Sequence, residues 1–200
     1  MANGWLVVGL GNPGPTYQLH RHNIGYLVLD ELARRAGAGF STPRGMRAEV
    51  CETRIGPLGT GAIGPDAQKV ILARSRTYMN ELGGPVSGLV KYHRIPVEQV
   101  IAVHDELDLD QGVLRLKKGG GDNGHNGLKS MRASLGSGDF HRVRFGIGRP
   151  PGRQAPADFV LSDFPASVRP ELEVDIVRAA DAIEALVTDG LAAAQNRFNG

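Results

Sequence analysis

Short apolar runs recur along the chain and predict buried strands. Residues 5–10, 70–73 and 100–103 are continuously apolar, which is typical of strands covered on both faces. Residues 46–55 alternate polar and apolar side chains, as expected of a strand with one solvated face. We therefore expect a sheet whose central strands are more deeply buried than its edges.

Apolar residues at helical spacing separate these strands. Ile24, Val28 and Leu32 recur every four positions and predict a helix, with Asn23 as its N-cap and Gly37 just after its end. Further helices are predicted over residues 82–90, 170–187 and 191–198. Strands that alternate with helices predict an α/β fold, with a mixed, mostly parallel twisted sheet flanked by helices.

Length and composition fit one globular domain, so we expect residues 1–200 to form a single folded unit. Glycine is the outlier, because it supplies 28 of 200 residues, about twice its usual ~7%. The excess lies in clusters at residues 9–14, 56–64 and 119–127, which indicates sharply turned or functional loops.

Cys51 is the only cysteine, which excludes an intrachain disulfide and favours a reducing compartment. The apolar run at residues 5–10 is too short for a signal sequence, and no segment approaches the ~20 apolar residues of a membrane span. We expect a cytoplasmic protein without a membrane partner. A monomer is the expected oligomeric state.

The charge distribution is uneven. Residues 113–153 hold nine lysines and arginines against two aspartates, whereas residues 158–189 hold eight acidic residues against two arginines. A basic block of this kind indicates a surface that faces a polyanion such as nucleic acid, the alternative being a solvated basic face.

Two predicted strands in the basic block present cationic side chains on one face. Arg115 and Lys117 alternate with leucines in the first strand, and Arg142 and Arg144 alternate with apolar residues in the second. This arrangement favours an anion site.

The segment GLGNPG at residues 9–14 satisfies the G-x-G-x-x-G pattern of dinucleotide-binding loops. Its context argues against a nucleotide, because Pro13 and Pro15 lack the backbone N–H groups that would hold a diphosphate. Asp30 and Glu31 have the spacing of the ribose-binding acid, but they lie inside a predicted helix. We therefore expect no cofactor.

With a nucleotide-binding loop excluded, we interpret residues 9–14 as a tight turn that places Asn12 at the carboxyl end of a strand. His20 and His22 follow closely, and Asp105 reaches the same edge if its strand is a parallel neighbour. A histidine oriented by an aspartate is a common general base, and the following helix N-terminus favours the neutral imidazole of His22. A loop histidine with a structural hydrogen bond is the alternative.

Other chemistries lack a signal in the sequence. No serine or cysteine lies in a nucleophile elbow, and no group of His, Cys or Glu residues has metal-ligand spacing. A water molecule activated by a base, without a metal, is the economical hypothesis.

Several stretches spread over almost the whole chain form one set. They are GLGNPG (9–14) with Tyr17, RHNIG (21–25), TYMN (77–80), HDELD (104–108), GGG (119–121) with GHNG (124–127), RVRFGIG (142–148) and DGL (189–191). In this order they resemble the bacterial-type peptidyl-tRNA hydrolase family. The resemblance implies hydrolysis of the ester between a peptide and the 3′ end of tRNA, which recycles prematurely released peptidyl-tRNA.

The resemblance also implies residue roles. His22 matches the catalytic base, Asp105 its orienting carboxylate, and Asn12 a candidate oxyanion donor near the scissile carbonyl. The positions matching the family's peptide-binding groove are Tyr17, Met79, Asn80, His125 and Asn126. Without the resemblance, both Asn80 and Asn126 could instead be helix caps.

The basic strands match the family's tRNA contacts. Lys117 and Arg144 resemble the clamp on the 5′-terminal phosphate of the acceptor stem, with Arg115 as a neighbour. One position departs from the pattern, because the family commonly has glycine where Asn123 stands. Asparagine tolerates a left-handed backbone, so the turn can survive.

Two alternatives to a peptidyl-tRNA hydrolase remain. One is an RNA-binding relative that has kept the fold and lost the chemistry. Against it argues the presence of His22, Asp105, Asn12, Asn80 and Asn126. The other is a general esterase that does not use tRNA, against which the basic strand faces argue.

Overall fold

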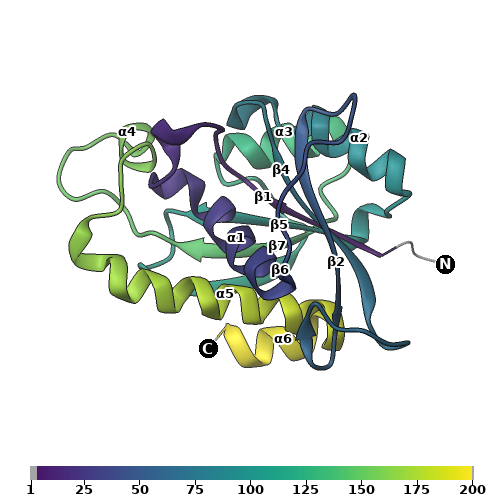
Figure 1. Ribbon diagram of the computed structural model, residues 1–200. Coiled ribbons are helices and arrows are strands. Elements are labelled where there is room, and N and C mark those ends of the chain that lie inside the picture. The colour runs from purple at the N-terminus through teal and green to yellow at the C-terminus, as the bar shows by residue number, and fades with distance from the viewer. Residues whose placement is uncertain (1–3, 200) are drawn as a thin grey trace.

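A mixed sheet of seven strands, in the order β3-β2-β4-β1-β5-β7-β6, runs through the computed structural model, which describes residues 4–199 (Figure 1). The strands are β1 (Trp5–Gly9), β2 (Ala48–Gly56), β3 (Gly59–Thr60), β4 (Gln68–Ser75), β5 (Val100–Glu106), β6 (Leu114–Lys118) and β7 (His141–Gly146). The four central strands are parallel, whereas β2, β3 and β6 at the two sides pair antiparallel. The predicted α/β fold with a mixed sheet is confirmed.

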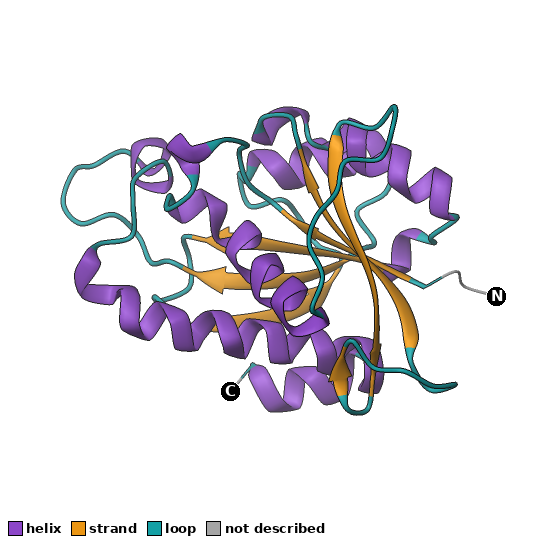
Figure 2. Cartoon of the chain, viewed as in Figure 1, coloured by secondary structure: helices purple, strands orange, loops and turns teal. Residues whose placement is uncertain are grey.

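Helices cover both faces of the sheet (Figure 2). They are α1 (Ile24–Ala36), α2 (Gly83–His93), α3 (Asn126–Leu135), α4 (Pro156–Val160), α5 (Arg169–Asp189) and α6 (Leu191–Phe198). Strand alternation divides the core into two layers: Val7 of β1 packs with α1 and α5, whereas Leu6 and Val8 pack with α2 and α3. Among the residues that the structure describes, no helix is long and apolar enough to cross a membrane.

The N-terminal end of α1 lies directly on the sheet because two glycines permit it. A Cβ atom on Gly9 would lie 2.5 Å from the carbonyl oxygen of Gly25, and one on Gly25 would lie 2.4 Å from that of Val103. Real side chains do not approach backbone so closely, so both positions require glycine. The first glycine of GLGNPG therefore has a packing role, and it brings the residues that precede α1 to the edge of β1 and β5.

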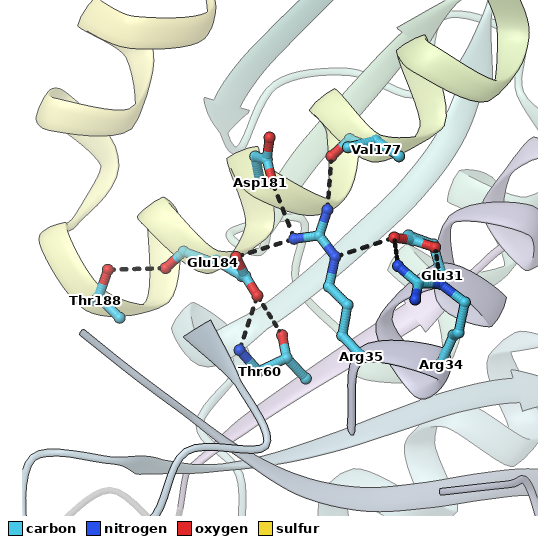
Figure 3. A network of polar contacts seen from close by, with 8 residues as sticks. All are labelled: Glu31, Arg34, Arg35, Thr60, Val177, Asp181, Glu184 and Thr188. Atoms are coloured by element: carbon cyan, nitrogen blue, oxygen red, sulfur yellow. Dashed lines mark hydrogen bonds and ion pairs between the residues drawn. The ribbon is translucent and has the colours of Figure 1, made fainter. Parts of the chain in front are cut away.

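A network of ion pairs ties α1 to α5 and to the β2–β3 hairpin (Figure 3). Arg35 contacts Glu31 at 3.2 Å, Asp181 at 2.9 Å and Glu184 at 3.0 Å. The other carboxylate oxygen of Glu184 accepts hydrogen bonds from the backbone N–H and the hydroxyl of Thr60. The network fixes the far end of α1, while the glycine contact fixes its near end.

The C-terminal segment covers the outer edge of β6. Asn199 Oδ1 accepts a hydrogen bond from the backbone N–H of Leu116 at 2.7 Å, and Gln195 donates to the carbonyl of the same residue at 3.0 Å. These side chains replace a further strand, so the edge does not present free backbone groups at this point. They also hold the strand that carries Lys117 in place.

Candidate active site

The carboxyl ends of β1 and β5 deliver the predicted polar residues to one edge of the sheet. The two strands are parallel neighbours, with Gly9 opposite Val103, so Asn12 and Asp105 follow at the same side. His22 lies in the 3-10 turn Arg21–Asn23, directly before α1. The expectation that the strand carrying Asp105 is a parallel neighbour of the first strand is confirmed. Asn12, His22 and Asp105 therefore lie at the same edge of the sheet.

His22 and Asp105 form a buried hydrogen-bonded pair. Nδ1 of His22 lies 3.0 Å from Oδ1 and 2.9 Å from Oδ2 of the carboxylate, and the residues are 8% and 3% exposed. A carboxylate only accepts, so Nδ1–H of the imidazole donates. The lone pair of a neutral His22 is then on Nε2, which leaves that atom as the one able to accept a proton.

A second imidazole shares the same carboxylate. Nε2 of His125 lies 2.8 Å from Oδ1 of Asp105, and its Nδ1 accepts a hydrogen bond from the backbone N–H of Gly127 at 3.1 Å. Because Nδ1 accepts, Nε2 carries the proton and donates to Asp105. His125 is thus the N-cap of α3 as well as a partner of the carboxylate, contacts that the sequence did not predict.

A third imidazole lies behind this pair. Nδ1 of His104 donates to the backbone carbonyl of Asp105 at 2.9 Å, and burial, followed by the nearby His125, lowers the pKa of His104 to about 3. His104 therefore stays neutral at physiological pH. Its ring packs edge-on against His125 at 5.1 Å between centroids, which fixes the second imidazole from behind.

The charge of Asp105 is set by these neighbours. Burial by itself would raise the pKa of this carboxyl group, but the facing His22 and His125 and their hydrogen bonds hold the pKa well below its ordinary value. Asp105 is therefore a carboxylate under all physiological conditions. A buried negative charge beside His22 stabilises that imidazole when it becomes protonated.

His22, Asp105 and His125 also have the side-chain types of a metal site, with ligand atoms within 4.8 Å of one another. The hydrogen bond from Gly127 argues against that use, because it leaves a proton on the only His125 nitrogen that faces the carboxylate. A metal would require that nitrogen to be deprotonated and His125 to abandon its helix cap. The arrangement suits proton transfer better than metal binding.

Hydrogen bonds hold both the side chain and the backbone of Asn12 in place. Its Oδ1 accepts a hydrogen bond from the backbone N–H of Met79 at 2.7 Å, which assigns the side-chain orientation. Asn23 bonds the Asn12 backbone on both sides, with Oδ1 accepting from the N–H at 2.9 Å and Nδ2 donating to the carbonyl at 2.8 Å. Asn23 is the N-cap residue of α1, as predicted, but its side chain makes no capping hydrogen bond and holds Asn12 instead.

The four other groove candidates lie in segments beside this centre. Met79 is buried and close to Gly127 of α3, and the Tyr17 ring lies 6.0 Å from that of Tyr78. Asn80 and Asn126 are exposed, the first in the 3-10 turn Met79–Glu81 and the second at the start of α3. The alternative capping roles do not apply, because Leu82 and His125 occupy the N-cap positions of α2 and α3.

A cavity of about 180 Å³ opens onto the paired side chains. His22, Asp105 and Asn126 line one part of it, while Pro156 and Val160 of α4 line another. The sequence placed these last residues in or beyond a Pro/Gly-rich loop and did not predict α4. The helix narrows the space above His22, which keeps the imidazole largely out of bulk water.

The basic strands pair as the alternation requires, with Arg115 opposite Arg144 and Lys117 opposite Arg142. One of the four does not face solvent. Arg142 is 1% exposed and donates to the carbonyls of Gly120, Gly121 and Gly138, so it fastens the glycine-rich loop. Its expected share in an anion-binding face is wrong, because the loop folds over it.

The other three cations remain at least partly accessible. Arg144 lies with Nε 3.5 Å from Glu106 and is 20% exposed, and Arg115 donates to the carbonyl of Leu114. Burial, then Arg144 and Arg142, lowers the pKa of Lys117, while Glu106 raises it. Like charges gathered this closely leave a site that an incoming anion would stabilise.

Sequence reasoning missed Asn23, His104 and Glu106 as parts of the site. All three adjoin residues that were identified, inside the stretches RHNIG and HDELD. Adjacency to a catalytic candidate was the available signal. Their contact partners could not be predicted from the sequence, because Asn23 contacts Asn12 and Glu106 contacts Arg144 only in the folded protein.

Known proteins match this chain over its whole length. A family model described as peptidyl-tRNA hydrolase matches residues 6–200. The peptidyl-tRNA hydrolase of Cutibacterium acnes is 59% identical over 199 residues, which cover 100% of both chains. That of Streptomyces coelicolor is 57% identical over 195 residues, covering 98% of this chain and 94% of the relative.

The fold agrees with solved structures as well. The crystal structure of peptidyl-tRNA hydrolase from Acinetobacter baumannii superposes with a TM-score of 0.86 at 32% sequence identity. The match covers 100% of this chain and 96% of that one. The likeness thus extends to every element that forms the site described above.

Proposed function

This chain belongs to the peptidyl-tRNA hydrolase family, and we propose that it cleaves the ester with a water molecule that His22 activates. The chain is an enzyme, and the bond it hydrolyses joins a peptide to tRNA. We propose which residues perform the reaction, and we propose that the reaction recycles tRNA from abortive translation. It is supported chiefly by one observation, the buried contact between Nδ1 of His22 and Asp105.

The proposed reaction begins with proton transfer. Nε2 of His22 takes a proton from a water molecule as the water oxygen attacks the carbonyl carbon of the ester. Asp105 remains ionised and stabilises the imidazolium that forms. When the intermediate collapses, the bond between the carbonyl carbon and the ribose oxygen breaks, and His22 returns its proton to that oxygen. The products are tRNA and a peptide carboxylic acid, which releases the second proton of the water to solvent and becomes a carboxylate.

Asn12 is proposed to stabilise the oxyanion of the tetrahedral intermediate. Its Oδ1 is occupied by Met79, so Nδ2 is the atom directed toward the reacting carbonyl. A donor that is already fixed needs no reorganisation when charge develops, which is why such groups contribute strongly to catalysis. Asn23 supports this role by bonding the Asn12 backbone on both sides.

Peptide recognition is assigned to the groove next to these residues. Asn80 and Asn126 carry exposed side-chain amides that can bond a peptide backbone, and Tyr17 and Met79 supply apolar walls. Aminoacyl-tRNA offers one residue with a charged amine and would leave these amides unpaired, which disfavours it as a substrate. His125 contributes indirectly, because it fixes both the start of α3 and Asp105.

Lys117 and Arg144 are proposed to bind the 5′-terminal phosphate of the tRNA acceptor stem, with Arg115 beside them. The three cations share one face of β6 and β7, and the positive charges of Arg144 and Arg142 near Lys117 increase the attraction for an anion. Phosphate contacts position a nucleic acid without reading its bases, so this clamp would accept many tRNAs.

Substitution of His22 tests the mechanism. His22→Ala should lower single-turnover hydrolysis of purified peptidyl-tRNA by roughly 10²–10⁴-fold, the usual contribution of a general base. His93→Ala, on the distant helix α2, is the matched control and should retain activity. Near-normal turnover by the His22 variant, with tRNA binding intact, would remove His22 as the base.

We further propose a cytoplasmic monomer in which residues 1–200 form one domain, acting without a metal or cofactor. The buried thiol of Cys51 suits a reducing compartment. One sheet connects all the helices described here, which supports a single folded unit. Size-exclusion chromatography with light scattering would test the monomer, and activity after dialysis against a chelator would test independence from metals.

A further inference from the structure

Asn123 stands in the glycine-rich loop between β6 and α3 with a left-handed backbone. Its φ of 48° lies in the region that glycine adopts most easily. A residue with a side chain at such a position invites the question of what that side chain contacts.

The Asn123 amide joins the loop to two carboxylates. Its Nδ2 donates to Oε1 of Glu106 at 2.5 Å and to Oδ2 of Asp108 at 2.6 Å. Both partners only accept, so the amide nitrogen must face them and uses one hydrogen for each. Glycine could make neither bond.

The two carboxylates depend on Asn123 to different degrees. Asp108 is exposed and also accepts from Nε of Arg149 at 2.9 Å. Glu106 is 4% exposed, and the other donor to its Oε1 is the backbone N–H of Asp108 at a long 3.4 Å. Loss of the Asn123 amide would therefore leave the buried Glu106 short of a donor.

Arg144 is the nearest cation that could satisfy Glu106. Its Nε lies 3.5 Å from Oε2, so the pair is in contact but not tightly hydrogen-bonded. A buried carboxylate without its amide donor would draw this guanidinium closer, because both its charge and its lone pairs would then need compensation. A guanidinium engaged in that way is less available to a phosphate.

We propose that Asn123 is a positioning residue for substrate binding: by satisfying Glu106, it keeps Arg144 available to the 5′-phosphate of the tRNA. This inference rests on the phosphate clamp proposed above. The Asn123 side chain would thus link two parts of the site. One is the loop that leads into His125 and Asn126, and the other is the strand that carries Arg144.

The test compares peptidyl-tRNA that carries a 5′-phosphate with the same substrate dephosphorylated to a 5′-hydroxyl. Asn123→Gly removes both hydrogen bonds and suits the left-handed backbone, so the variant should fold, which thermal unfolding verifies. We expect KM for the phosphorylated substrate to rise roughly threefold to tenfold, the range of one typical intramolecular hydrogen bond. KM for the 5′-hydroxyl substrate and kcat for both should stay near the wild-type values.

A rescue and a matched control separate this role from a structural one. In Asn123→Gly/Glu106→Gln the neutral amide no longer attracts Arg144, so KM for the phosphorylated substrate should return toward the wild-type value. Asp122→Gly removes the hydrogen bond that Oδ1 of Asp122 accepts from the backbone N–H of Gly124, so it loosens the same loop but leaves the Asn123 contacts in place. It should show no phosphate-dependent change in KM.

Three outcomes would overturn the proposal. Unchanged kinetics of Asn123→Gly would make Asn123 a turn residue only. An equal loss on both substrates would show that it acts on the loop rather than on Arg144, as would failure of the double substitution to rescue. Arg144→Ala distinguishes the inference from its premise: if that variant loses the phosphate preference while Asn123→Gly keeps it, the clamp stands and the role of Asn123 fails.

Discussion

Nδ1 of His22 lies 2.9 Å from Oδ2 of Asp105, although 83 positions of the chain separate the two residues. The contact exists because β1 and β5 are parallel neighbours and because α1 begins directly on top of them. Gly9 and Gly25 permit that close approach. The geometry of the proposed catalytic pair thus depends on two glycines that carry no chemistry.

Replacement of Asp105 by asparagine should lower kcat strongly without unfolding the protein. An Asn side chain can turn its N–H₂ toward Nδ1 of His22, which would place the imidazole proton on Nε2 and prevent that atom from accepting one. We expect single-turnover rates to fall by roughly 10²–10⁴-fold. Because His125 also donates to this carboxylate, His125→Asn is the comparison variant and should cause a smaller loss. Equal losses would show that both imidazoles are required alike.

Asn12→Asp should lower kcat while leaving KM nearly unchanged. The aspartate can still accept the hydrogen bond from Met79, so the loop stays in place, but it offers no N–H to the oxyanion. Loss of one oxyanion donor lowers rates by roughly 10²–10³-fold. Single-turnover kinetics with saturating enzyme would measure this directly. A variant that changed only KM would move Asn12 from catalysis to ground-state binding.

Lys117→Ala and Arg144→Ala should raise KM more for 5′-phosphorylated peptidyl-tRNA than for a minimal peptidyl-nucleotide ester. Each variant should also reduce the slope of log affinity against log salt by about one, because one phosphate contact is lost. Titrations at several salt concentrations would show this. Equal effects on both substrates would contradict the clamp.

Gly25→Ala should destabilise the fold by roughly 2–3 kcal/mol, since the added methyl group would meet the backbone of β5 and of Leu10. Urea unfolding would measure the change, and activity should fall as His22 is displaced. Gly88→Ala is the matched control. It lies on the exposed side of α2 with open space around it, so it should stabilise by about 0.5–1 kcal/mol. A neutral Gly25→Ala would mean that α1 can shift without cost.

The ion pairs of Glu31 should contribute to stability in neutral but not in acid solution. Its hydrogen bond from Arg34 and its contact with Arg35 outweigh burial and lower the pKa of the carboxyl group from 4.5 to about 2. A lowered pKa in the folded state stabilises above the unfolded value, and the contribution is lost as pH falls from 4.5 toward 2. Glu31→Gln should therefore destabilise at pH 7 and much less near the acid end of this window. Urea unfolding at both ends would show it, and an equal destabilisation throughout would contradict the ion-pair origin.

The fold class and the central pair of the site were predictable because their signals are local. The apolar runs at residues 5–10 and 100–103 identified the two strands, and Asn12, His22 and Asp105 follow directly from their ends or precede a helix. The resemblance to a known family added the roles of the groove and of the basic strands. Conversely, α4 escaped prediction, because its five residues follow a Pro/Gly-rich loop and carry no helical repeat.

What the sequence by itself determined is therefore most of the strands and helices, the face on which each side chain stands, and the residue types gathered at the ends of the strands. Only the tertiary structure decided which groups meet. Alternation put Arg142 on the face of Arg144, but the glycine-rich loop covers the first and not the second. In the same way, His125 and Asn123 acquired their carboxylate partners only when the loop folded onto β5. The physical reason is that hydrophobic period and strand pleat act over a few residues, whereas burial and hydrogen-bond partners depend on segments far apart in the chain.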